Sequence, residues 1–140
     1  MIRYIRSIDR TAACHLALAH ELRRTRQVAI DYFVPWERIS TVGLSSLEVS
    51  DAVGDDGIRL YTAKLTAMLP CAIVPPSEPT AYRLTLTDGT QLLLGTSHRP
   101  HPVLTQTDTH PDRAAERCAC TLTVTWTADV GVLEIISLKS

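Results

Sequence analysis

The sequence predicts a mainly β protein, an antiparallel sandwich or partly closed barrel of about seven to nine strands. Apolar and polar residues alternate over ten positions at 118–127. The pair Asp88-Gly89 separates two apolar runs, as in a β-hairpin. The stretch GDDG at 54–57 has the composition of a turn. We expect a single domain over 1–140. At most one or two short helices are expected, at 11–26 and 111–117.

The segment 11–27 allows two interpretations. Its Ala, Leu, Glu and Arg residues favour a helix. The alternation from Cys14 to Leu22 also fits a strand, and we favour the strand slightly. Both alternatives stay open, because a short apolar alternation does not separate them.

Residues 28–69 have the pattern of successive strands. VAIDYFV (28–34) is rich in β-branched and aromatic residues, and WERISTV (36–42) continues it after a bend. LSSLEVS (44–50) is a weaker strand, which GDDG joins to a long strand at 58–69. Pro70 lacks an N–H group, so this strand ends, bulges or lies on an edge there. The residues predicted to point inward from the long strand are Tyr61, Ala63, Leu65, Ala67 and Leu69.

The stretch YRLTLTDGTQLLL (82–94) predicts a hairpin with a two-residue turn at Asp88-Gly89. In that register Thr85 faces Leu92, and Arg83 faces Leu94. Two leucines then share a face with polar residues, opposite the face that supplies the core. Such a face needs to be covered by another segment or another subunit. The predicted interface residues are therefore Arg83, Thr85, Leu92 and Leu94.

Residues 95–117 show no clear period. Within them VLTQT (103–107) is a possible short strand, and Pro111 suits the first position of one or two helical turns. Two strands follow, at 118–127 and 132–138.

Cys118 and Cys120 raise the question of a zinc site with two of the upstream histidines. Neighbouring ligands in structural zinc sites are usually two to four residues apart, and Cys-X-Cys is tighter. The alternation places both cysteines on the apolar face with Trp126, where a free cysteine packs as a small hydrophobic residue. The sequence therefore predicts core cysteines, no metal and no cofactor.

The aperiodic loop at 97–117 is a candidate ligand-binding or anion-binding element. Long loops in compact domains are often functional, although many are only solvated surface. The residues of this loop that could contact an anion are His98, Arg99, His101, His110 and Arg113.

Composition excludes several functional classes. Hydrophobic residues make up 45% and charged residues 21%, with a formal net charge of −1, so no strong nucleic-acid signal exists. No apolar run is long enough for a signal peptide or a membrane span, which predicts a cytoplasmic location or a place within a protein assembly. Residues 1–43 hold seven Arg and four acidic residues, whereas 44–90 hold three cationic and six acidic residues. This charge separation could guide head-to-tail self-association.

No catalytic motif occurs in the sequence, which argues against an enzyme. The predicted function is a non-catalytic structural or protein-interaction module that assembles with itself or docks on a protein partner. Small β domains of this kind occur in virus particles and other assemblies, which is an analogy at the level of the fold. The alternative is a small ligand-binding or anion-binding domain that uses the loop at 97–117.

Overall fold

The computed structural model describes residues 2–16, 20–22, 27–30, 34–70, 78–96, 101–109, 119–128 and 132–137. The protein is mainly β, as the alternations predict, and its fold is sandwich-like. The elements in chain order are β1 (Ile2–Ala12), the 3-10 helix η1 (Ala13–Leu16), β2 (His20–Leu22), β3 (Gln27–Ile30), β4 (Glu37–Ile39), β5 (Ser45–Val53), β6 (Arg59–Leu69), β7 (Thr80–Leu86), β8 (Gln91–Leu94), β9 (Val103–Thr109), β10 (Ala119–Ala128) and β11 (Leu133–Ser137).

These strands form one open sheet in the order β2-β3-β11-β8-β7-β1-β5-β6-β10-β9, with β4 beside β1. The predicted number of seven to nine strands was too low. The prediction of antiparallel pairing was wrong for one pair, because β3 and β11 are parallel. Within the described residues no helix is long and apolar enough to cross a membrane.

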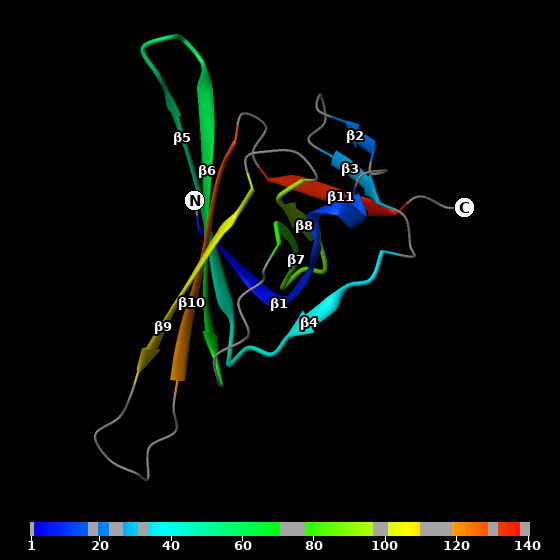
Figure 1. Ribbon diagram of the computed structural model, residues 1–140, viewed down its shortest axis with the longest axis vertical. Helices are drawn as coiled ribbons and strands as arrows, with labels where there is room; N and C mark the ends of the chain where they lie inside the picture. Colours follow the sequence, from blue (N-terminus) through cyan, green and yellow to red (C-terminus); the bar gives the residue numbers. More distant parts are fainter. Residues whose placement is uncertain are drawn as a thin grey trace.

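The sheet folds over on itself, so that β5, β6, β10 and β9 pack against β1, β7 and β8 (Figure 1). The main core lies between these two layers. The alternating residues of β10 supply part of it, with Cys120, Leu122, Val124 and Trp126 all buried. A second apolar cluster lies on the other face of β7 and β8. Its buried members are Leu16, Val28, Ile30, Val34, Ala81, Leu93 and Leu133.

Strand β1 links the two layers and was not predicted from the sequence. Its first residues pair with β5, and its later residues pair with β4 on one side and β7 on the other. The register with β7 shifts between Ile5 and Ser7, which inserts Arg6 as a β-bulge. Ile5 and Ile8 therefore both enter the main core, although they are three residues apart. The bulge hides the period of two that identifies a strand.

The segment 11–27 is neither one helix nor one strand. It contains the end of β1, the single turn η1 and the short strand β2. Thr11 and His15 make a side-chain hydrogen bond of 2.9 Å across this turn. The other possible helix, at 111–117, lies outside the described residues.

The hairpin of β7 and β8 exists, but its predicted register was wrong by one residue. Leu84 pairs with Leu92, and Tyr82 pairs with Leu94. The loop has three residues, because Gly89 N donates to the Leu86 carbonyl and Leu86 N donates to the Thr90 carbonyl. Gly89 has a φ of 94°, the left-handed geometry that completes a type I turn followed by a bulge.

Candidate functional site

The corrected register decides the position of the predicted interface residues. Leu92 and Leu94 are buried in the main core with Leu84, so the chain itself covers them. Thr85 is also buried. The predicted placement of Leu92 and Leu94 on the face opposite the core was wrong, since a register shift of one residue exchanges the two faces of a strand. The predicted interface role depended on two leucines lying opposite the core, and the structure does not place them there.

Arg83 takes part in an ionic cluster on the face opposite the main core. Asp9 accepts hydrogen bonds from Arg83 Nε at 3.1 Å and Nη2 at 3.0 Å, and from Arg38 Nε at 2.7 Å. The guanidinium of Arg83 also lies over the ring of Trp36, 4.8 Å from its centroid. These contacts join β1, β4 and β7, since Asp9 is the cross-strand partner of both arginines. The cluster therefore has a structural explanation.

The predicted ligand loop is described only in part. His98, Arg99, His110 and Arg113 lie outside the described residues, as does Cys118. His101 is half-buried, and its Nδ1 atom has no hydrogen-bond partner among the described residues. VLTQT is part of β9, which is longer than the short strand expected there. In the described part of the chain no group of three or more His, Cys, Asp or Glu residues could hold a metal ion.

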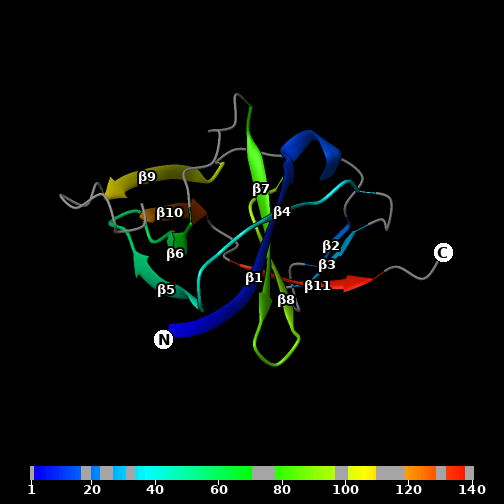
Figure 2. The ribbon, with the colours of Figure 1, turned by 90° about the horizontal axis from the view of Figure 1, so that it is seen from below.

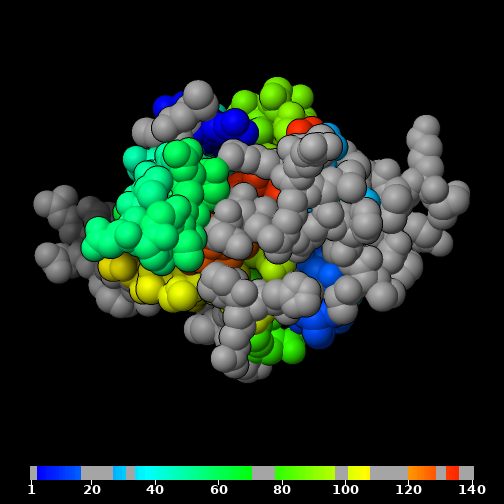
Figure 3. Space-filling model, turned by 90° about the horizontal axis from the view of Figure 1, so that it is seen from above, coloured from blue at the N-terminus to red at the C-terminus, as the bar shows by residue number. Residues whose placement is uncertain are grey.

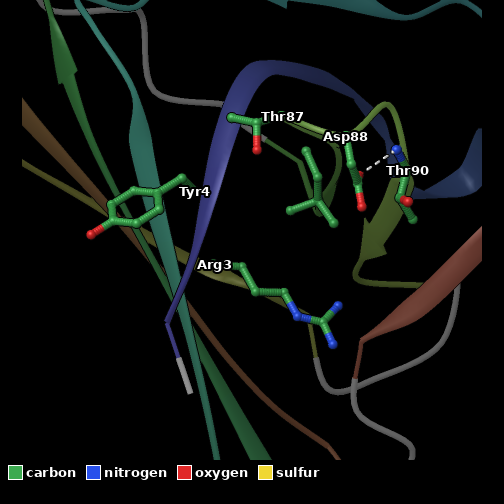
Figure 4. Close-up of a pocket in the computed structure, with 6 residues that line it drawn as sticks. Arg3, Tyr4, Thr87, Asp88 and Thr90 are labelled. Atoms are coloured by element: carbon green, nitrogen blue, oxygen red, sulfur yellow. Dashed lines mark hydrogen bonds between the residues drawn. The ribbon is translucent and has the colours of Figure 1, made fainter.

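A hollow of about 400 Å³ lies between β1 and the turn of the β7–β8 hairpin (Figure 4). Arg3 and Tyr4 line it from β1, and Asp88 lines it from the turn. Asp88 accepts a hydrogen bond of 2.9 Å from Thr90 N, and this bond is the main cause that lowers the pKa of the Asp88 carboxyl. The lining contains no His, Cys or Ser, and its hydroxyl groups belong to Tyr4, Thr87 and Thr90.

Thr11 and His15 do place a hydroxyl beside an imidazole. Thr11 is buried near the end of β1, whereas His15 is exposed in η1, so the bond joins these two elements. The bond therefore holds η1 against the end of β1.

The distal half of the β5–β6 hairpin projects beyond the rest of the molecule, and we call residues 50–60 the arm (Figure 1). Every residue of the arm is exposed. Pairing of β5 with β1 ends at Glu48, and pairing of β6 with β10 reaches only to Tyr61. Seen from above, the arm is an uncovered block of the surface (Figure 3).

The tip of the arm repeats the turn of the other hairpin. Gly57 N donates to the Gly54 carbonyl at 2.9 Å, and Gly57 has a φ of 81°. Asp56 accepts a hydrogen bond of 3.0 Å from Ile58 N, as Asp88 does from Thr90 N. The prediction that GDDG joins two strands is therefore confirmed. These bonds give the exposed tip a defined shape.

The arm carries apolar side chains into solvent. Val53, Ile58 and Leu60 are 56%, 53% and 45% exposed. The arm also carries an ion pair of 3.3 Å between Arg59 and Asp51. Val53 lies on the opposite face of the hairpin from Leu60, since Val53 pairs with Arg59 and Leu60 pairs with Ala52. Single exposed apolar residues are ordinary, whereas neighbouring ones such as Ile58 and Leu60 are a common feature of interaction surfaces. Alternation in the sequence predicts a strand here, but not whether a neighbouring strand covers it.

Among the described strands, β9 pairs with β10 alone and lies at one end of the sheet. The last residues of β5, Val49 to Val53, pair with β6 beyond the point where the pairing of β5 with β1 ends. Figure 2, from below, shows β9 at the outer limit of its layer. Comparison with protein-family models, with curated proteins and with solved structures gives no match.

Proposed function

We propose that the protein is a non-catalytic structural module that binds other proteins, copies of itself included, through exposed β surfaces. The observation that carries the proposal is the arm, where Val53, Ile58 and Leu60 stand in solvent on a turn of fixed geometry. When a partner covers exposed apolar groups, the free energy of the system falls, because apolar surface is removed from water.

The test is the mass of the protein in solution, measured by light scattering during size-exclusion chromatography over a range of concentrations. We expect a defined oligomer. The double variant Ile58→Ser, Leu60→Ser should have a lower mass and an unchanged unfolding midpoint, because both side chains are exposed in the monomer. The matched control is Met68→Ser, which alters an exposed apolar residue at the other end of β6. A wild-type protein that stays monomeric at every concentration contradicts self-assembly.

One observation favours a second candidate function, the binding of a small anion by the loop at 97–117. His101 Nδ1 is buried without a partner among the described residues, and a buried polar atom normally has one. A bound ligand could supply that partner. Titration with inorganic phosphate should then raise the unfolding midpoint of the wild-type protein but not of His101→Phe. Equal midpoints with and without phosphate in the wild type would contradict this function.

A further inference from the structure

The hollow beside the β7–β8 turn carries a cation on one wall and an anion on the other. Arg3 extends from β1 towards the side formed by Asp88 and Thr90, whereas Tyr4 points to the other side of β1 (Figure 4). Arg3 and Asp88 are both exposed, and neither makes an ion pair with a described residue. After the hydrogen bond from Thr90 N, the charge of Arg3 also lowers the pKa of the Asp88 carboxyl, so the two side chains face each other across a gap.

The anionic wall is held in place by the turn. Asp88 accepts its 2.9 Å bond from Thr90 N, and the Thr90 side chain bonds the same carboxyl. Leu86 N donates to the Thr90 carbonyl at 2.8 Å, which closes the loop. Leu86 is buried, pairs with Ile5 of β1 and forms an apolar floor. A ligand therefore meets a carboxylate of fixed position, which reduces the cost of ordering the site on binding.

The charges of the lining select against simple ions. Arg3 and Asp88 cancel, so an inorganic anion is repelled by Asp88 and a metal cation by Arg3. A zwitterion would lose the hydration of two charges in exchange for exposed ion pairs, which contribute little. A neutral hydroxyl group suits both walls, because its oxygen accepts from a guanidinium and its hydrogen is donated to a carboxylate. Hydrogen bonds to charged groups are about twice as strong as neutral ones.

We infer that the hollow binds the neighbouring hydroxyl groups of a sugar ring. One hydroxyl accepts a hydrogen bond from Arg3, and the next donates one to Asp88. The Thr87 hydroxyl makes no hydrogen bond with a described residue and is placed to bond a third. The C–H face of the ring packs on Leu86. The volume of about 400 Å³ lies within the range of roughly 300–1,000 Å³ that small-molecule sites have.

This site shares no residue with the arm, so the inference goes beyond the proposed function and does not depend on it. Arg3, Thr87 and Asp88 are exposed, so the hollow encloses only one side of a ring. A free sugar and the end of a glycan chain present the same hydroxyl groups and are the two possible sources of the ligand.

The test is a titration of the isotope-labelled protein with the methyl glycosides of mannose, glucose and galactose, followed by the chemical shifts of the backbone amides. We expect at least one glycoside to bind with a Kd of about 1 mM, the affinity that a ligand of this size gains at ordinary efficiency. The shifts should be confined to residues 3–4 and 86–90. The same sugar at the end of a trisaccharide separates the sources: comparable affinity indicates a glycan end, and weaker binding indicates a free sugar.

Two variants and a matched control locate the site. Asp88→Asn keeps an oxygen that accepts the bond from Thr90 N, and Arg3→Gln alters an exposed side chain, so both should have the unfolding midpoint of the wild type. Each should weaken sugar binding at least about tenfold, because each removes a charge-assisted bond. The control is Arg6→Gln, which alters an exposed arginine of β1 that does not line the hollow and should bind like the wild type.

A titration in which no glycoside shifts these amides overturns the sugar site, and so does wild-type affinity in both Arg3→Gln and Asp88→Asn. Glycine and inorganic phosphate are the competing probes. Stronger binding of either at residues 3–4 and 86–90 would show that the hollow takes a zwitterion or an anion and not a sugar. None of these outcomes affects the role of the arm, which is tested by the mass of the protein in solution.

Discussion

Removal of the Asp9 carboxylate should destabilise the protein far more than the loss of an ordinary surface charge. The side chain is only 4% exposed and accepts three charge-assisted hydrogen bonds, two from Arg83 and one from Arg38. Breaking a buried ion pair on one side costs about 3–5 kcal/mol. Arg83 retains 25% side-chain exposure and can regain some water, so we expect Asp9→Ala to cost about 3 kcal/mol.

The two arginines should differ, although both contact the same carboxylate. Arg38 is 64% exposed, and exposed ion pairs contribute about 0–1 kcal/mol, so Arg38→Ala should cost less than about 1 kcal/mol. Arg83→Ala removes two bonds to Asp9 and the contact with Trp36, and should cost about 2–3 kcal/mol. The expected order of destabilisation is therefore Asp9→Ala, then Arg83→Ala, then Arg38→Ala.

Urea unfolding followed by circular dichroism measures these differences in the free energy of unfolding. The comparison requires that the slope of this free energy against urea concentration is the same in all variants. The double variant Asp9→Leu, Arg83→Met is the control for an uncompensated charge. It should be more stable than Asp9→Ala, because it leaves no half-buried guanidinium without a carboxylate. A loss from Arg38→Ala as large as that from Asp9→Ala, or a loss from Asp9→Ala below about 1 kcal/mol, would show that Asp9 does not act as a buried ion-pair partner.

Three further predictions follow from single residues. Gly89→Val should cost about 1–3 kcal/mol in urea unfolding and Gly89→Asn distinctly less, because φ is 94° there; equal losses would contradict the turn geometry. Burial raises the pKa of Tyr82 to about 12, against the opposing charge of Arg10, so stability should fall as pH rises from about 10, the unfolded pKa, towards 12. Tyr82→Phe should lack this loss, which alkaline unfolding curves measure. In single-cysteine variants, buried Cys120 should react slowly with a thiol reagent and exposed Cys14 rapidly; fast labelling of both would show that β10 does not bury its apolar face.

The sequence predicted strands best where one face is buried along the whole strand. In β6, the predicted inward residues Ala63, Leu65, Ala67 and Leu69 are buried, and Tyr61 is half-buried near the arm. In β10, Cys120 is buried as predicted and makes a contact of 3.5 Å between its Sγ and Gln106 Oε1. Alternation is reliable here because each strand has a single regular pairing on each side.

Two of the sequence predictions were wrong for local reasons, one in β1 and one in the β7–β8 hairpin. In β1, Arg6 interrupts the alternation, so Ile5 and Ile8 resemble neither a strand nor a helix. In the β7–β8 hairpin, Asp-Gly fits a two-residue turn and also the end of a three-residue loop. The structure has the three-residue loop, in which Leu86 pairs with Thr90 and every later pair moves by one position.

The exposed arm was harder to predict from the sequence than the strands were. Val53 and Leu60 have the same pattern as strand residues that end in a core. Their exposure depends on where β1 and β10 stop pairing, and that is a property of the tertiary structure. The place of β9 at one end of the sheet is likewise a matter of strand order, which no local pattern in VLTQTDT encodes.

The parallel pairing of β3 with β11 has a consequence for how the chain folds. Val28 of β3 pairs with Ile135 of β11, more than 100 residues later in the chain. β1 likewise pairs with β7, which follows it only after β2 to β6. Contacts between such distant segments are made only after a large loss of chain entropy, so folding should be slow for a domain of this size. During synthesis the second apolar cluster cannot form until Leu133 has left the ribosome. Until then the exposed strands of the nascent chain are open to pairing with other chains, which makes this period the most vulnerable one for aggregation.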